Sequence, residues 1–176
     1  MIICPSCHAE NIEGADECGE CSQPLNEMGV RMPATSVEAD LMRDRIEKLW
    51  PKRPSTVSPE TTVGEVLQKM VGETIGCVMV VDAAGKLVGI FSERDALMKL
   101  NVDAPKSFAK PISQFMTAQP VTLETRDKIA FALHKMNLGG YRHLPILFEG
   151  QLAGVISIRD ILRYLTERIA VARPVR

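Results

Sequence analysis

The chain has 176 residues, 45% of them hydrophobic, and a formal net charge of −1 at pH 7. This length suits one medium domain or two small ones, and the charge gives no general attraction to nucleic acid or to an anionic membrane. No apolar run approaches the ~18 residues of a membrane-spanning helix, and the N-terminus lacks the features of a secretory signal. We therefore expect a cytoplasmic protein.

Four cysteines form two Cys-x-x-Cys pairs near the N-terminus, Cys4 with Cys7 and Cys18 with Cys21. Four thiolates in two close pairs suit the tetrahedral coordination of Zn²⁺, with iron as the alternative metal. So short a segment needs a bound metal to fold. Two disulfides fit poorly with the missing secretion signal, and a redox dithiol lacks its usual strand–helix context.

With its Cys-Pro-Ser-Cys and Cys-Gly-Glu-Cys pairs, segment 1–25 resembles the short zinc ribbon at the ends of many bacterial and archaeal proteins. His8 and Ser22 stand where that family usually has glycine. The segment has no Lys or Arg before Arg31 and several acidic residues, so it should repel nucleic acid. We expect it to dock a protein partner or to be purely structural.

Residues 26–45 are expected to be a linker followed by an amphipathic helix. Residues 28–33 have linker character, and Ser36 is a candidate N-cap. Apolar residues from Val37 to Trp50 recur at helical spacing on one side. We expect this side to pack on the domain that follows.

An internal repeat makes up the remainder of the chain, as residues 46–105 and 106–172. The offset between matching residues is 66 before a hairpin turn and 65 after it. Such self-similarity is a strong architectural signal. Each copy has the pattern of an α/β (α+β) unit, with an extended segment, a helix, two strands and a helix.

The predicted elements of the two copies correspond to one another. The first copy has a helix at 59–71, strands at 75–81 and 86–91, and a helix at 92–100 that Ser92 caps. The second has a helix at 126–137, strands at 141–147 and 151–156, and a closing helix at 157–172. Cys77 falls in an apolar run, where a cysteine acts as a small hydrophobic residue and not as a redox group.

Both copies carry Gly-x-x-Ser-x-x-Asp where the second strand runs into the last helix. The two elements are 89–95 and 154–160. Backbone N–H groups at a helix start attract phosphate, and an ionised aspartate one turn later can accept hydrogen bonds from two ribose hydroxyls. The motif predicts a site for an anionic, sugar-bearing ligand.

The repeated unit with this ending resembles the CBS domain, named after cystathionine beta-synthase, and two in tandem resemble a Bateman module. The resemblance covers roughly residues 46–166. It implies a sensor that binds AMP, ADP, ATP or S-adenosylmethionine in clefts between the paired domains. It also implies a homodimer. Because the sequence shows no effector domain, we expect the module to act on a protein partner in trans.

The resemblance also implies which residues bind the ligand. Asp160 and Asp95 match the ribose-binding acid, and the adenine lies on the extended segment of the opposite copy. One cleft then contains Asp160 with Ser157, Arg159, Ser55, Thr56, Gly76 and Cys77, and the other contains Asp95 with Ser92, Arg94, Val121 and Thr122.

Tyr141, Arg142 and His143 match a strand-start motif whose basic residues face the ligand phosphates. The first copy has Gly76 and Cys77 there and lacks the basic pair. We therefore expect the Asp160 cleft to bind distinctly better, or only one nucleotide to fit per module.

Two other functions compete with the sensor. One is a nucleic-acid-associated transcriptional regulator that uses the ribbon or a basic C-terminal helix, with Arg163, Arg168, Arg173 and Arg176. The other is an enzyme, but no nucleophile–base pair or Walker-type loop is present, and the three histidines show no catalytic constellation. We expect a non-catalytic module.

Overall fold

The computed structural model describes residues 2–4, 6–12, 15–23, 25, 35–100 and 104–171. They belong to two compact units, Met1–Asp40 and Leu41–Arg176. Among the described residues, no helix has both the length and the apolar character needed to cross a membrane. The linker expected at 28–33 lies outside the described residues.

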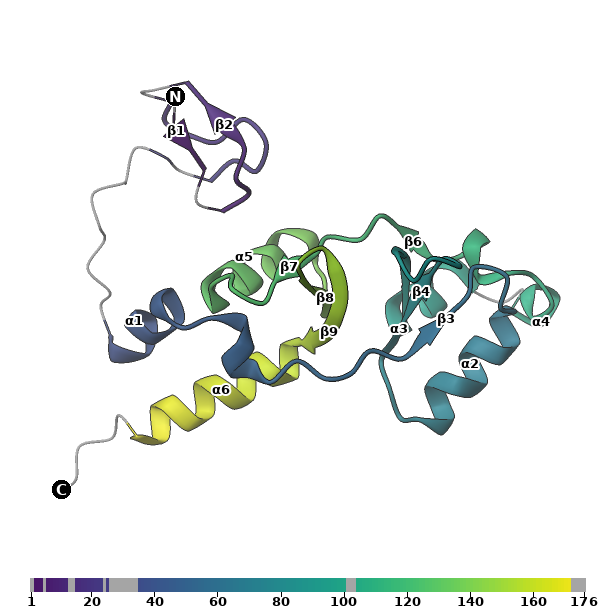
Figure 1. Ribbon diagram of the computed structural model, residues 1–176. Helices are drawn as coiled ribbons and strands as arrows, with labels where there is room; N and C mark the ends of the chain where they lie inside the picture. Colours follow the sequence, from purple (N-terminus) through teal and green to yellow (C-terminus); the bar gives the residue numbers. More distant parts are fainter. Residues whose placement is uncertain are drawn as a thin grey trace. The chain divides into compact units, whose positions relative to one another are not determined.

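The first unit contains a small antiparallel ribbon. Strand β1 (Ile2–Ile3) pairs with β2 (Glu10–Asn11) (Figure 1). Leu25 is buried in one cluster with Cys4 and Cys18. This cluster is far too small to hold a fold without further support.

The predicted amphipathic helix is shorter than expected. Helix α1 (Ser36–Arg43) is capped by Thr35, whose Oγ1 accepts a hydrogen bond from the Glu38 N–H at 3.1 Å, and not by Ser36. The chain is extended at Arg45 and then forms the 3-10 helix η1 (Ile46–Leu49). Trp50 is 83% exposed, so its assignment to the packed side of one long helix was wrong.

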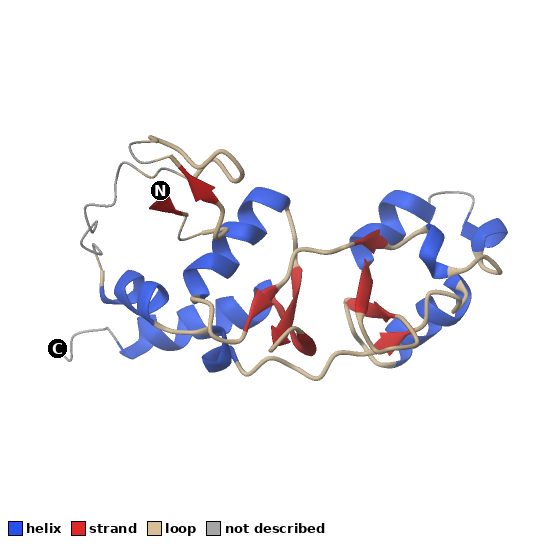
Figure 2. Cartoon of the chain, turned by 45° about the horizontal axis from the view of Figure 1, so that its top comes forward, coloured by secondary structure: helices blue, strands red, loops and turns tan. Residues whose placement is uncertain are grey.

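The second unit contains two mixed sheets, each flanked by helices (Figure 2). The order in the first is β3-β4-β5-β6, and in the second β7-β8-β9. The strands are β3 (Thr56–Val57), β4 (Cys77–Val81), β5 (Leu87–Ser92), β6 (Thr117–Ala118), β7 (Leu123–Glu124), β8 (His143–Phe148) and β9 (Gln151–Ser157).

The register of each hairpin aligns the motif serine with the start of the neighbouring strand. Cys77 pairs with Ser92 across β4 and β5. His143 pairs with Ser157 at the matching place in β8 and β9. Each serine therefore lies at a helix start, directly opposite the first residue of the neighbouring strand.

The helices agree with the sequence-based elements in type and differ at their ends. They are α2 (Val63–Gly72), α3 (Glu93–Asp95) continued by the π-helix η2 (Ala96–Leu100), α4 (Ala104–Ser107), the 3-10 helix η4 (Ile112–Gln114), α5 (Ile129–Gly139) and α6 (Ile158–Val171). Helix α2 begins four residues later than predicted, because Thr62 and Glu65 form a reciprocal capping box.

The leading 3-10 helix of each copy packs in the core of the other copy. Ile46 and Leu49 of η1 are buried with Leu144 and Ile156 of the second copy. In the same way, Ile112 of η4 is buried in the first copy's core. The two copies are therefore interlocked.

The crossing segments explain the glycine of each motif. Lys52 exchanges two backbone hydrogen bonds of 3.0 Å with Val155 of β9, and β6 pairs with β5 in the equivalent place. A Cβ atom on Gly154 would lie 2.7 Å from Cβ of Pro51, and one on Gly89 would overlap the side chain of Met116. Only glycine allows this close approach.

Asp44 ties the segment before η1 to α6. Its buried carboxylate accepts hydrogen bonds from Tyr164 Oη at 2.8 Å, Lys48 Nζ at 2.9 Å and Arg168 Nη2 at 3.2 Å. Burial alone would raise the pKa of Asp44, but hydrogen bonds from Lys48, Tyr164 and Arg43 lower it to about 2. Arg168 is thus engaged in the fold, which weakens the case for α6 as a nucleic-acid surface; Arg173 and Arg176 lie outside the described residues.

Candidate functional site

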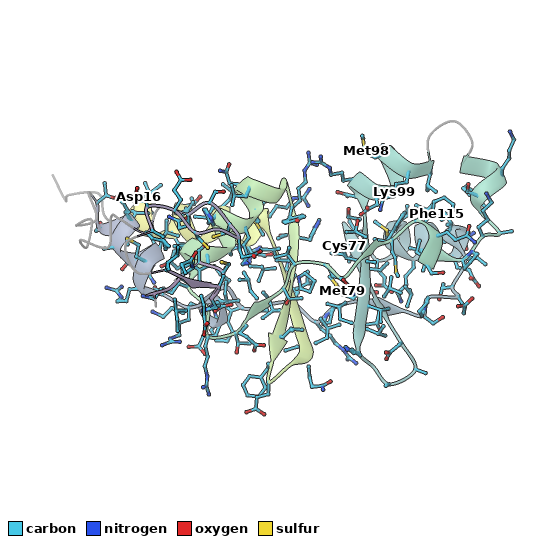
Figure 3. All side chains as sticks on the ribbon, turned by 90° about the horizontal axis from the view of Figure 1, so that it is seen from above. Asp16, Cys77, Met79, Met98, Lys99 and Phe115 are labelled. Atoms are coloured by element: carbon cyan, nitrogen blue, oxygen red, sulfur yellow. The ribbon has the colours of Figure 1, made fainter. Side chains whose placement is uncertain are left out.

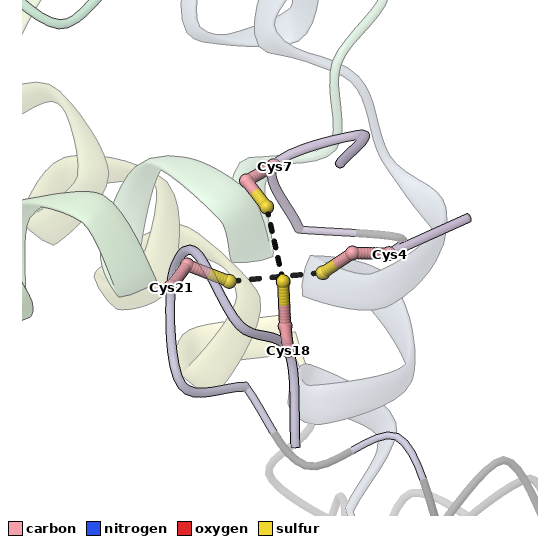
Figure 4. Close-up of side chains that lie close together, drawn as sticks. All are labelled: Cys4, Cys7, Cys18 and Cys21. Atoms are coloured by element: carbon pink, nitrogen blue, oxygen red, sulfur yellow. Dashed lines mark hydrogen bonds between the residues drawn. The ribbon is translucent and has the colours of Figure 1, made fainter. Parts of the chain in front are cut away.

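The four N-terminal cysteines form one sulfur cluster. All four Sγ atoms lie within 4.8 Å of one another (Figure 4). Cys7 and Cys18 are 3.5 Å apart, and Cys4 and Cys21 are 3.7 Å apart. Tetrahedral Zn–S bonds of about 2.3 Å separate the sulfur atoms by about 3.8 Å. The donor set therefore fits a metal ion with four thiolate ligands.

The turns after each cysteine pair have the geometry of metal-binding knuckles. The His8 N–H donates to the Cys4 carbonyl, and the Ser22 N–H to the Cys18 carbonyl, both at 2.9 Å. His8 and Ser22 have positive φ angles of 62° and 54°. They adopt the left-handed conformation that glycine has in related ribbons, at a cost of roughly 1–2 kcal/mol each. The His8 side chain is exposed and is not part of the sulfur cluster.

Two clefts lie in the second unit, one at each motif aspartate. The Asp95 cleft has a volume of about 390 Å³ and the Asp160 cleft about 300 Å³. Both volumes are in the range of small-molecule sites. Each cleft is lined by residues from both copies of the repeat, because the crossing segments bring the copies together.

Most of the predicted ligand-binding residues line these clefts. Those at the Asp160 cleft are Ser55, Gly76, Cys77, Arg142, His143, Ser157, Arg159 and Asp160. Those at the Asp95 cleft are Ser92, Arg94, Asp95, Val121, Tyr141, Arg142 and His143. Thr56 and Thr122 line neither cleft, because consecutive side chains of an extended segment point in opposite directions.

One oxygen of each motif aspartate is committed to a helix cap. Asp160 Oδ2 accepts from the N–H of Ser157 at 2.8 Å and from its hydroxyl at 2.6 Å. Asp95 and Ser92 form the same pair, at 2.9 Å and 2.6 Å. The serine hydroxyls therefore donate to the aspartates, which leaves them only acceptor capacity toward a phosphate.

The other oxygen differs between the two sites. Asp95 Oδ1 pairs with Lys99 Nζ at 2.7 Å and accepts from Thr117 Oγ1 at 2.8 Å. Among the described residues, Asp160 Oδ1 has only longer contacts, with Lys52 Nζ at 3.4 Å and Arg163 Nη2 at 3.5 Å. A ligand hydroxyl can thus displace the partners of Asp160 more easily than those of Asp95.

Both aspartates remain ionised near neutral pH. Burial would raise the pKa of Asp160, but hydrogen bonds from Ser157 and the charge of Lys52 outweigh it and lower the pKa. Burial likewise opposes the lowered pKa of Asp95, which Lys99 and Ser92 cause. Each carboxylate can therefore accept hydrogen bonds from ribose.

The first amide of each motif helix is already used. The Glu93 N–H donates to the Gly76 carbonyl at 3.0 Å, and the Ile158 N–H donates to the Arg142 carbonyl at 2.9 Å. These two amides are therefore closed to a phosphate.

His143 lies between the clefts and lines both. A Cβ on Gly76 would lie only 2.7 Å from Cε1 of this ring, so Gly76 makes room for it. Burial lowers the pKa of His143, the charges of Glu93 and Asp160 oppose this, and Arg159 and Arg142 add to it. The ring is therefore neutral at pH 7 and becomes a cation only in acid.

Sequence reasoning missed several lining residues. Lys52, Arg53 and Glu93 line the Asp160 cleft, and Lys99 lines the Asp95 cleft. Lys52 and Arg53 are visible in the sequence as a basic pair between Pro51 and Pro54. Lys99 stands four residues after Asp95, a spacing that predicts an ion pair on a helix.

Cys77 also lines the Asp160 cleft, as a buried residue of β4 (Figure 3). Burial, with the charge of Glu93, raises the pKa of its thiol to about 12. The thiol is therefore not a reactive nucleophile near neutral pH. This agrees with its expected role as a small hydrophobic residue.

Two interlocked α/β units with clefts at their junction define a tandem pair of α/β domains. The family model of the CBS domain matches residues 38–101 and 112–167. This is more than half of the chain, so the chain belongs to the CBS domain family and contains the domain twice.

Solved structures and curated relatives share this architecture. A CBS-domain containing protein from Agrobacterium tumefaciens is 30% identical, with a TM-score of 0.65 over 69% of this chain and 98% of that chain. A CBS domain protein from Pyrobaculum aerophilum, solved in complex with AMP, is 25% identical, with a TM-score of 0.63 over 73% of this chain and 100% of that chain. An inosine-5'-monophosphate dehydrogenase from Aquifex aeolicus is 36% identical over 62% of this chain, which spans only 22% of that enzyme.

Proposed function

We propose that this chain is a regulatory module that binds an adenosine-type ligand in the Asp160 cleft and holds a structural zinc ion on its four N-terminal cysteines. The observation that carries the proposal is the carboxylate of Asp160, ionised and buried at the cleft, with Oδ2 fixed by the cap and Oδ1 only loosely paired. Such an oxygen suits ribose hydroxyls. AMP in the Pyrobaculum relative supports this ligand class.

The proposed domains are a zinc ribbon at 1–25, a linker with an amphipathic helix at 26–45, and CBS domains at 46–105 and 106–172. Iron is the alternative metal, because thiolates accept both ions. We infer that the ribbon docks a protein partner or only stabilises the chain. The module has no catalytic role in this proposal, and it acts in trans as a homodimer.

The cleft suggests how a ligand exerts control. Ser55 and Gly76 come from the first copy, while Ser157 and Asp160 come from the second. A ligand that contacts both sides stabilises the packing of the copies in which these residues face one another. It shifts the equilibrium by its difference in affinity between the two packings.

The test combines native mass spectrometry and calorimetry. Mass spectrometry of freshly purified protein should report one zinc ion, a co-purified adenosine ligand and the oligomeric state. By calorimetry with AMP, Asp160→Ala should weaken binding roughly 10–100-fold, since a hydrogen bond to a charged group contributes about 1.5–3 kcal/mol. The matched variant Asp95→Ala should change it little.

Because Asp160→Ala also removes the cap of α6, Asp160→Asn serves as a second variant, in which the amide oxygen can keep the cap while the charged acceptor for ribose is lost. Thermal melting shows whether each variant is folded. Unchanged AMP affinity in folded Asp160→Ala would reject the assignment of this cleft.

A further inference from the structure

The cations at the Asp160 cleft are largely without partners. Four permanent cations line it, Lys52, Arg53, Arg142 and Arg159, against the two carboxylates of Glu93 and Asp160. Within the part of the chain that the structure describes, no hydrogen bond or ion pair engages the side chains of Arg53, Arg142 or Arg159. All three are exposed and open to a ligand.

The cations at the Asp95 cleft are already engaged. Lys99 pairs with Asp95 and also donates to the Phe115 carbonyl at 2.8 Å (Figure 3). Arg94 donates to the Gly140 carbonyl at 3.3 Å. Arg142 lines both clefts and is the one cation at the Asp95 cleft that has no partner among the described residues. The two clefts therefore offer different amounts of available positive charge.

From this difference we propose that the Asp160 cleft selects a nucleoside di- or triphosphate over a monophosphate or a sulfonium nucleoside, with Arg53 and Arg159 as the specificity-determining residues. The inference rests on the proposed function and names the ligand class of the same site. Each guanidinium can bind a phosphate through two parallel hydrogen bonds. A polyphosphate chain offers more acceptor oxygens over a greater length than a single phosphate, so it can engage more of these guanidiniums.

The positions of these cations on three different elements favour an extended anionic ligand. Arg53 comes from the crossing segment before β3, Arg142 directly precedes β8, and Arg159 lies in the first turn of α6. Ribose binding to Asp160 Oδ1 would also release Lys52 from its 3.4 Å contact, which adds a fourth cation. The positive sulfonium of S-adenosylmethionine would meet the same group of cations and be repelled.

Calorimetry with ATP, ADP, AMP, S-adenosylmethionine and inorganic tripolyphosphate in magnesium-free buffer tests the inference. Wild-type protein should bind ATP at least about tenfold more tightly than AMP. Arg53→Gln and Arg159→Gln should each weaken ATP binding by about tenfold, because a charged hydrogen-bond donor is lost, and should change AMP binding by less than about threefold. Arg126→Gln is the matched control, since Arg126 is exposed and lines neither cleft.

The outcomes separate this inference from the proposed function. If AMP or S-adenosylmethionine binds as tightly as ATP, or if the two variants leave the ATP-to-AMP ratio unchanged, the polyphosphate selection is wrong while the adenosine site stands. If no adenosine ligand binds but inorganic tripolyphosphate binds and depends on Arg53, the proposed function fails while the polyanion site stands. If neither binds, both fail.

Discussion

Replacing Lys99 by methionine should open the Asp95 cleft to ribose. Lys99 Nζ lies 2.7 Å from Asp95 Oδ1, the oxygen that a ribose hydroxyl would need. The lysine side chain is 37% exposed, so the pair contributes about 1 kcal/mol, as surface ion pairs do. A ligand that no longer has to break this pair should bind about fivefold more tightly.

The assay is calorimetry with adenosine in an Asp160→Asn background, so that the Asp95 cleft dominates the signal. Adenosine lacks phosphate, which removes any direct contribution of the lysine charge to phosphate binding. Lys99→Arg keeps the cation and should show no gain. Equal or weaker adenosine binding in Lys99→Met would refute the idea that Lys99 blocks Asp95.

Two further predictions concern His143 and the cysteines. Because the fold lowers the pKa of His143, the folded state binds fewer protons than the unfolded state, and the free energy of unfolding should fall as the pH drops below about 6.5. The variant His143→Gln should lose this pH-dependent contribution. If urea unfolding gives the same difference in stability between wild type and variant at pH 5.5 and at pH 7.5, the prediction is wrong. Cys18→Ser or a strong chelator should remove the metal and expose segment 1–25 to protease without shifting the melting of the CBS pair, whereas Cys77→Ala should retain the metal.

The element types followed from the sequence more readily than their boundaries did. Ser58 followed by Pro59 has the form of a helix start, yet the helix begins after Thr62 because Glu65 completes a capping box there. Both signals are local, and the one with two reciprocal hydrogen bonds prevails. Similarly, the chain is extended at Arg45, which forms a bridge with Lys128 of the second copy, so periodicity alone extended the first helix too far.

The pairing of the two copies could not be read from the repeat. Ile46 and Ile112 match each other in sequence, but nothing local shows that each is buried in the opposite core. The same crossing brings Lys52 and Arg53 to a cleft that contains Asp160. Both residues were visible as a basic pair, but their function depends on contacts more than 100 positions away along the chain.

The inequality of the clefts arises from single positions at which the copies differ. Lys99 of the first copy corresponds to Tyr164 of the second, and the tyrosine hydroxyl bonds to Asp44 instead of the motif aspartate. Asp160 therefore has no lysine one turn later and is left with the longer contacts to Lys52 and Arg163. A duplicated fold thus keeps both caps intact while only Asp160 retains a loosely paired Oδ1, because the cap uses Oδ2 and the varied residues act on Oδ1.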